Sequence, residues 1–252
     1  MKITVITGGS QGIGLAIGKL LASQGHKVYL CARNQEPLTE AVKEIRALGH
    51  LAESCLLDVT WPKSVDSVFQ TIYEQEGHLD ILINSAGMSG FSELENDNDI
   101  QLWQKVLQTN LSGAYYCSRS AALKMKEHHW GRIVQIASTL GLEGMRNSYA
   151  YTASKHGLIG LTRGMALDVL DWGITVNAVC PGWVETPMGK SSMAKIAEHY
   201  GLPPQTFEEE EIRAVPIQRW IQPKEVAHMV AYLVSEESGA VTGKAFEISG
   251  GL

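Results

Sequence analysis

The chain has 252 residues, of which 44% are hydrophobic and 19% charged, and its formal net charge at pH 7 is −6. This length and balance fit one large α/β domain with ample material for a single core. Proteins that bind nucleic acids carry a basic patch or stripe, so the acidic balance argues against that class of function.

The cysteines and histidines give no sign of a metal site. Cys31, Cys55, Cys117 and Cys180 include neither a C-x-x-C pair nor zinc-like spacing, so we expect reduced and mostly buried thiols. No H-E-x-x-H motif occurs, and no metal is predicted. The opening residues resemble a strand, and no charge-free apolar stretch of about 18 residues is found. We therefore expect a soluble, cytoplasmic protein with no membrane span.

Short apolar runs alternate with segments of helical periodicity along the chain. Continuous apolar runs are typical of strands buried on both faces of a parallel sheet. We predict strands at 2–7, 26–32, 52–58, 79–84, 131–138, 173–180 and 244–249. We predict helices at about 13–24, 37–48, 62–76, 99–128, 149–171 and 223–234. The alternation predicts an α/β fold, a Rossmann-type doubly wound parallel sheet of seven strands flanked by helices, in a single domain spanning residues 1–252.

One long connection, residues 183–216, separates the sixth and seventh strands and contains helix-like pieces. Long connections inside compact domains are usually lids or binding loops, so we predict a helical substrate lid here. Met188 and Met193 could line an adaptable apolar pocket, although filling the core is an equal alternative. The acidic run Glu208–Glu211 is interpreted as a solvated face.

The first predicted strand is followed directly by the segment TGGSQGIG, residues 7–14. Glycines between a strand and a helix allow a tight turn and let backbone N–H groups approach a pyrophosphate at the helix N-terminus. Because the segment opens the first βαβ unit, it predicts a dinucleotide site. The residues predicted to bind the cofactor there are Gly8, Ser10, Gln11, Gly12, Ile13 and Gly14.

The end of the second strand favours NADP(H) over NAD(H). Sites for NAD usually place an acidic residue there to hold the ribose 2′-hydroxyl, but this chain has Ala32 and then Arg33. The Arg33 guanidinium is a permanent cation that suits a 2′-phosphate. After the third and fourth strands, further predicted cofactor contacts are Asp58, Val59, Asn84, Ala86 and Gly87.

Tyr151 and Lys155 lie four residues apart on a predicted helix and therefore share one face, whereas Tyr149 points elsewhere. A free tyrosine has a pKa of about 10. A lysine cation about 4 Å away would contribute about 4 kcal/mol at an effective dielectric near 20, enough to lower that pKa by about 3 units. Ser138, at the end of the fifth strand, could donate a hydrogen bond to the same substrate oxygen. The pattern predicts acid–base catalysis by Tyr151.

These motifs together resemble the single-domain short-chain dehydrogenases/reductases, and the resemblance runs from end to end. TGGSQGIG resembles the family's T-G-x-x-x-G-x-G, NSAG its N-N-A-G, with Ser85 in place of the second Asn, and YTASK its Y-x-x-x-K. The resemblance implies a catalytic tetrad of Asn110, Ser138, Tyr151 and Lys155, with hydride supplied by NADPH and a proton by Tyr151. It also implies that the nicotinamide end is contacted by Pro181, Gly182, Val184 and Thr186, in the segment NAVCPGWVET.

Within that family, segments such as IAST, CARN and the terminal GGL are most similar to the aromatic (type II) polyketide ketoreductases. That branch reduces a poly-β-ketone carried on an acyl carrier protein, as a homotetramer using NADPH. One departure is Ser89-Gly90-Phe91, where the branch often has Pro-Gly-Gly, a feature associated with stereochemical control. The residues predicted to contact substrate are Gly90, Phe91, Thr139, Leu140, Met145, Met188 and Met193.

Two other functions are compatible with the same motifs. A 3-oxoacyl-thioester reductase of fatty-acid or storage-polymer metabolism would use the same tetrad and cofactor, and the lid sequence favours polyketides over it. A sensor or scaffold that binds NADP(H) without turnover is a third alternative. Such proteins tend to lose the tyrosine or the lysine, and both Tyr151 and Lys155 are present.

Overall fold

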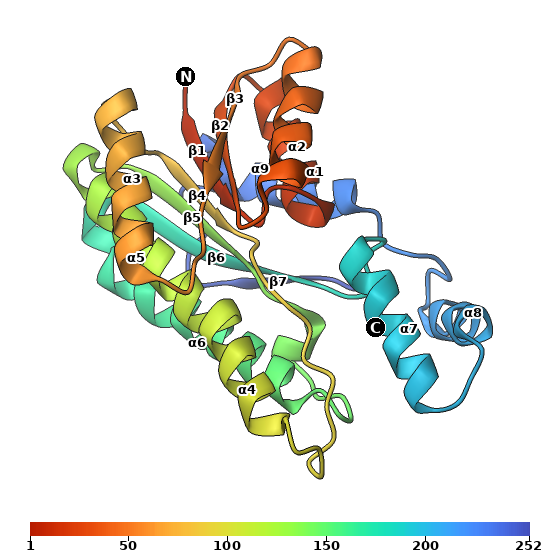
Figure 1. The fold of residues 1–252 in the computed structure, drawn as a ribbon. Coiled ribbons are helices and arrows are strands. Elements are labelled where there is room, and N and C mark those ends of the chain that lie inside the picture. Colours follow the sequence, from red (N-terminus) through yellow and green to blue (C-terminus); the bar gives the residue numbers. More distant parts are fainter.

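Seven parallel strands form the centre of the computed structural model, which describes residues 1–252 (Figure 1). Their order across the sheet is β3-β2-β1-β4-β5-β6-β7. The chain runs outward from β1 to β3 and then returns to the other side of β1, so the order reverses between β1 and β4. Ligands of doubly wound sheets bind at such a reversal, outside the carboxyl ends of the strands. The bounds are β1 Ile3–Thr7, β2 Lys27–Ala32, β3 Ala52–Leu56, β4 Ile81–Asn84, β5 Gly131–Ile136, β6 Ile174–Pro181 and β7 Ala245–Ile248.

Helices cover both faces of the sheet and create two cores. Helices α1 (Gly12–Ser23), α2 (Gln35–Ala47) and α9 (Pro223–Val234) pack on one face, and α3 (Pro62–Glu76), α5 (Gly113–Met125) and α6 (Tyr149–Asp168) on the other (Figure 1). Successive strand residues enter different cores: Val5 packs in the α3–α5 core, and Ile6 in the α1–α2 core. Because side chains alternate along a strand, burial on both faces makes β1 continuously apolar. The predicted fold class is confirmed.

The predicted helix at 99–128 is interrupted. Helix α4 (Asp99–Leu107) leads into a π-helical turn, Gln108–Ser112, before α5 begins at Gly113. A side chain at Gly113 would lie 2.7 Å from the Val59 side chain, so only glycine lets α5 approach the loop after β3 this closely. One extra residue in a helical turn hardly disturbs hydrophobic periodicity, which is why the sequence did not reveal the interruption.

The segment at 183–216 contains two helices that the sequence suggested only as helix-like pieces. Helices α7 (Pro187–His199) and α8 (Pro204–Ala214) lie beyond the carboxyl ends of β6 and β7 (Figure 1). Both begin at a proline, the residue whose missing N–H is harmless in a first turn. None of the helices is both long and apolar enough to span a bilayer.

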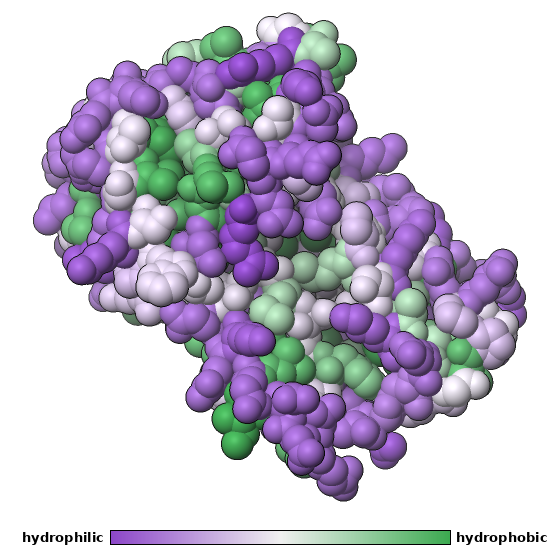
Figure 2. Space-filling model, in the orientation of Figure 1, coloured by the Kyte–Doolittle hydropathy of each residue, from purple (hydrophilic) through white to green (hydrophobic).

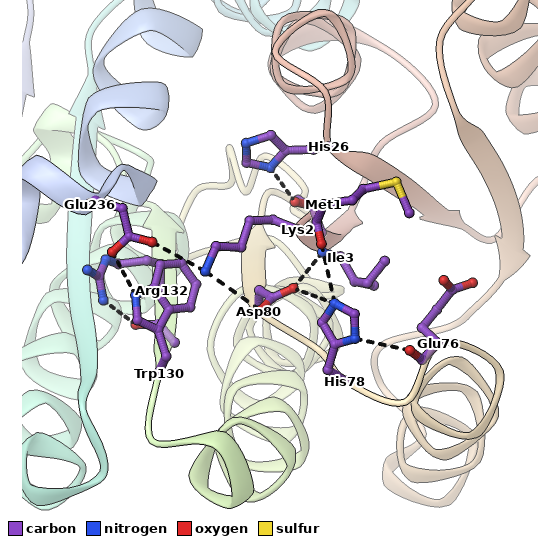
Figure 3. Close-up of polar contacts among 12 residues, drawn as sticks. Met1, Lys2, Ile3, His26, Glu76, His78, Asp80, Trp130, Arg132 and Glu236 are labelled. Carbon is purple, nitrogen blue, oxygen red and sulfur yellow. Dashed lines mark hydrogen bonds and ion pairs between the residues drawn. The ribbon is translucent and has the colours of Figure 1, made fainter.

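Polar contacts close the opposite, amino-terminal edge of the sheet (Figure 3). The Asp80 carboxylate accepts a hydrogen bond from the Ile3 N–H at 2.6 Å and lies 4.0 Å from the Lys2 ammonium. Lys2 also pairs with Glu236 at 3.3 Å and lies 3.3 Å from the centre of the Trp130 ring. These contacts join the starts of β1, β4 and β5 to the turn after α9, at the end of the sheet away from the predicted site.

Candidate active site

A cavity of about 400 Å³ opens at the carboxyl ends of the strands, between the start of α1, the loop after β4, the N-terminal part of α6 and helix α7. In Figure 2, apolar residues gather in a hollow between the main body and the segment that carries α7 and α8. The fold therefore brings most predicted site residues into one space. Those that line the cavity are Gly8, Ser10, Gln11, Gly12, Ile13, Gly87, Gly90, Phe91, Ser138, Thr139, Leu140, Met145, Tyr151, Lys155, Pro181, Gly182, Val184, Thr186 and Met188.

The glycine loop is shaped for close backbone approach. Gly8 has φ +65°, a left-handed conformation that side chains disfavour, and a Cβ on Gly14 would lie 2.3 Å from the Gly8 carbonyl oxygen. Gly14 itself lies behind the loop and does not line the cavity. Gln11 precedes α1 and caps it with no side-chain hydrogen bond, so the first N–H groups of α1 remain free for an anion. The loop thus fits the pyrophosphate of a dinucleotide.

Arg33 lies outside the main cavity, in a neighbouring depression that also contains Thr60 and Lys105. The Arg33 side chain is exposed and takes part in none of the ion pairs of the protein, so it is available to an external phosphate. Asp58 lines neither space, because its carboxylate accepts hydrogen bonds from the Thr60 N–H and hydroxyl at 2.9 and 2.8 Å. Val59 is buried, 7% exposed, and lines neither.

Asn84 and Ala86 lie beneath the cavity rather than on its wall. The Asn84 amide donates to the Ser118 hydroxyl at 2.8 Å and to the Ala114 carbonyl at 3.3 Å, which ties the end of β4 to α5. Ala86 supports the glycine loop: a side chain at Gly8 would approach its Cα to 2.8 Å. Both residues therefore shape the cofactor side from behind.

The four tetrad residues come from three separate parts of the chain. Ser138 follows β5, and its hydroxyl accepts a hydrogen bond from the Leu140 N–H at 3.2 Å. On α6, the Lys155 ammonium donates to the Ile136 carbonyl at 2.7 Å and lies 5.4 Å from the centre of the Tyr151 ring. Ser138, Tyr151 and Lys155 all face the cavity, in an arrangement suited to proton transfer.

Asn110 does not line the cavity but joins two of its walls. Its side chain accepts from the Met88 N–H at 2.9 Å, and it donates to the Met88 carbonyl at 3.0 Å and the Ser154 hydroxyl at 3.1 Å. The π-helical turn places this side chain between the loop after β4 and α6. Helical irregularities of this kind are frequent at functional sites.

Comparison with known proteins identifies the family. The short chain dehydrogenase family pattern matches residues 2–197. The chain belongs to the short chain dehydrogenase family.

Three full-length similarities refine the family assignment. A Streptomyces violaceoruber protein provisionally named ketoacyl reductase 1 of the granaticin polyketide synthase is 40% identical, over 99% of this chain and 92% of the relative. The 3-oxoacyl-[acyl-carrier-protein] reductase FabG of Escherichia coli is 34% identical, over 100% of this chain and 97% of the relative. The crystal structure of a variant of actinorhodin polyketide ketoreductase with NADPH superposes with a TM-score of 0.95 at 38% identity, over 100% of this chain and 97% of the other.

Burial sets the ionisation of the two α6 residues in this family member. It raises the pKa of Tyr151 to about 12, against a smaller opposing effect of the Ser138 hydroxyl. It lowers the pKa of Lys155 to about 8, because an ammonium group loses its hydration inside the protein. The sequence led us to expect that Lys155 would lower the pKa of Tyr151. In the structure, burial raises the pKa of Tyr151 instead, and the group that opposes this rise is Ser138 rather than Lys155.

Two more predicted positions lie elsewhere. Met193 on α7 is 1% exposed and does not line the cavity, while Met188 does. Five residues along a helix rotate the side chain by about 140°, so these two methionines cannot share a face. The Tyr149 hydroxyl contacts the Asp99 carboxylate at the start of α4 and does not reach the cavity. No cluster of three or more potential metal-ligating side chains is present.

The sequence missed several wall residues. Met88 and Trp183 directly follow predicted contacts, Gly87 and Gly182, and extending each motif by one residue would have found them. Ile196 also lines the cavity and belongs to no motif, and Leu252 lines it at the end of the GGL segment, which gave no sign of a contact with the site. Their participation depends on how α7 and the chain end fold back over the strands.

Proposed function

We propose that the protein is an NADPH-dependent ketoreductase that reduces a carbonyl of a poly-β-ketone carried on an acyl carrier protein, in aromatic polyketide biosynthesis. The observation that best supports this proposal is that one cavity contains both sets of residues. Ser138, Tyr151 and Lys155 line the same cavity as the glycine loop, whose free N–H groups fit a dinucleotide. The similarity to polyketide synthase reductases supports the substrate class.

The proposed mechanism uses the residues that surround the carbonyl. NADPH, when bound, supplies a hydride to the carbonyl carbon. The Tyr151 hydroxyl protonates the carbonyl oxygen, and its pKa of about 12 keeps that proton in place at neutral pH. Ser138 donates a hydrogen bond to the same oxygen, and Lys155 holds the ribose hydroxyls and stabilises the tyrosinate that forms. Asn110 keeps the loop after β4 against α6.

The preference for NADPH rests on Arg33. Its exposed, unpaired guanidinium at the end of β2, with no acidic residue in the strand end, suits a 2′-phosphate and gives a ribose hydroxyl no acceptor. Phosphate recognition by arginine is bidentate and charge-assisted, which makes it one of the stronger polar contacts available.

The substrate side supports an extended, largely uncharged ketone. Apart from Lys155, the only Asp, Glu, Lys, Arg or His side chain that lines the cavity is Glu143. The apolar wall of the cavity is formed by Met88, Phe91, Leu140, Met145, Trp183, Met188, Ile196 and Leu252. A site of this composition suits a hydrophobic ligand oriented by a few polar groups. We propose that α7 and α8 form the lid over it.

The proposed assembly is a cytoplasmic homotetramer that receives its substrate from the acyl carrier protein. Large apolar side chains are exposed on the outer faces of α5 and α6, including Tyr115, Leu123 and Leu167, which is 77% exposed. Large apolar side chains left exposed on neighbouring helices are candidates for an association surface.

A 3-oxoacyl-thioester reductase is the second candidate. The full-length similarity to the E. coli reductase favours it, since that relative shares the same chain architecture. A substrate comparison separates the two, because a reductase adapted to linear acyl chains should turn over 3-oxoacyl thioesters and not fused-ring ketones.

The experiment compares Tyr151→Phe with the unchanged protein, using NADPH and the fused-ring ketone trans-1-decalone. We expect kcat to fall by about 1,000-fold, within the range of about 10² to 10⁴ that general acid catalysis provides. Tyr149→Phe is the matched control and should stay within about threefold, because its hydroxyl lies outside the cavity. Full activity of Tyr151→Phe would contradict the mechanism, and turnover of linear thioesters alone would favour the second candidate.

A further inference from the structure

The loop after β4 meets the end of α7 across the cavity, and two aromatic rings make the contact. The Phe91 and His199 rings lie edge to face, with centroids 5.1 Å apart and planes at 68°. Phe91 also packs against the apolar cluster of Ile196, Ala197 and Phe207 from α7 and α8. One side chain of the main body is therefore inserted into the proposed lid.

Phe91 stands between the cavity and His199. Phe91 lines the cavity, whereas His199 does not. Gly90, the residue before Phe91, lies directly against α6, because a Cβ at Gly90 would be 3.4 Å from the Tyr151 backbone nitrogen. Phe91 thus starts beside the proposed proton donor and extends to α7, so its ring closes the cavity on the α7 side.

Polar partners hold the other side of the His199 ring. Its Nε2 lies 3.3 Å from the Asn147 side-chain nitrogen and 3.5 Å from the Glu93 carboxylate. Nε2 can accept from Asn147 when it is unprotonated and donate to Glu93 when it is protonated, so the ring has a partner in either state. A backbone hydrogen bond of 2.8 Å from Ser92 to Asn147 joins the same two segments. Three parts of the chain therefore meet at His199.

We propose that His199 is a positioning residue: it fixes the Phe91 ring as a wall of the substrate cavity, and this wall limits the size of the ketone that can reach Tyr151. The inference rests on the proposed ketoreductase function and names a specificity determinant for it. A ring held on one side by apolar contacts and on the other by His199 cannot swing aside without breaking both. Substrates that extend past Phe91 toward the His199 end of α7 are then disfavoured through binding, whereas compact ketones do not reach that end.

The test measures kcat and KM separately for a compact and an extended ketone, trans-1-decalone and the N-acetylcysteamine thioester of 3-oxododecanoate. His199→Ala and Phe91→Ala should each raise kcat/KM for the extended ketone about 3- to 10-fold, the size of one aromatic pair contact, through KM. For His199→Ala, which lies outside the cavity, activity with trans-1-decalone should change less than twofold. Because His199 acts through Phe91, the double variant should match Phe91→Ala alone.

Two further variants separate the ring contact from general loosening. His199→Phe keeps an aromatic edge against Phe91 and should retain the original selectivity. Leu94→Ala alters the same loop at a side chain that is 79% exposed and lies outside the cavity. It should leave kcat/KM unchanged for both ketones. Thermal unfolding and NADPH binding of each variant report whether the fold is intact.

The outcomes of these experiments distinguish a failure of the positioning role of His199 from a failure of the proposed ketoreductase function. If the unchanged protein reduces neither ketone, or only the linear thioester, the proposed function fails. If it reduces them but the effects of His199→Ala and Phe91→Ala add, or His199→Ala lowers kcat for both ketones equally, the positioning role is wrong. Loss of selectivity in His199→Phe would likewise overturn it.

Discussion

The cofactor side and the substrate side of the cavity are built in different ways. The cofactor side is mainly backbone: free N–H groups at the start of α1, and glycines so close that a Cβ on Gly14 would lie 2.3 Å from the Gly8 carbonyl. The substrate side is mainly apolar side chains, such as Phe91 and Trp183, brought together from distant segments. The backbone groups are placed to bind the cofactor, which is the same whichever ketone is reduced. Under the proposed function, the apolar side-chain walls select among the ketones.

The largest effect that this comparison predicts is at Gly14. Gly14→Ala should weaken NADPH binding about 100-fold or more, because the new Cβ meets backbone that has no free rotamer to adopt. Binding is measured by quenching of protein fluorescence or by calorimetry. Gly160→Ala is the matched control, since nothing lies within 4 Å of its added methyl group and alanine favours a helix. NADPH affinity within threefold of the original for Gly14→Ala would contradict the backbone-cradle view.

The next effect separates the two nicotinamide cofactors. Arg33→Ala should lower kcat/KM for NADPH about 10- to 100-fold, as expected for loss of a charge-assisted contact, with little change for NADH. The KM for the ketone should stay constant, because Arg33 lies in a separate depression. Steady-state kinetics with both cofactors give the answer. Unchanged selectivity between the cofactors would refute the role of Arg33.

The smallest predicted effect is the pH dependence of kcat/KM, which involves the cofactor side and the substrate side of the cavity together. Burial lowers the pKa of Lys155 to about 8, so its cation is lost above that pH while Tyr151 remains protonated. We expect kcat/KM for reduction to fall up to about tenfold per pH unit above pH 8, equally for compact and extended ketones.

Unfolding does not account for this fall. A lysine with a depressed pKa loses its proton in the folded state first, so its contribution to stability rises between about pH 8 and its ordinary pKa of about 10.4. Unfolding temperatures recorded over the same pH range test this sign. A flat rate profile up to pH 10 would show that the Lys155 charge is not required.

The sequence predicts a feature best when the residues that form it lie close together in the chain. The glycine loop and the α6 pair were recognised because their members lie within eight residues of one another, so strand and helix periodicity alone places them. Asp58 and Asn84 were placed by their positions at strand ends. The Asp58 carboxylate binds Thr60, two residues further on, a local turn pattern that the sequence could have shown. The Asn84 amide binds Ser118, 34 residues away, and nothing local in the sequence signals that partner.

By itself, the sequence determined the doubly wound sheet, the glycine loop and the shared face of Tyr151 and Lys155, because strand alternation, tight turns and helical spacing are local rules. Only the tertiary structure decided that Phe91 packs against His199, 108 residues further along the chain, since two segments so far apart meet only when the whole sheet is assembled. It also decided the ionisation of Tyr151. Attraction between charges depends on spacing that a helix fixes, but the opposing cost of burial depends on everything that surrounds the site.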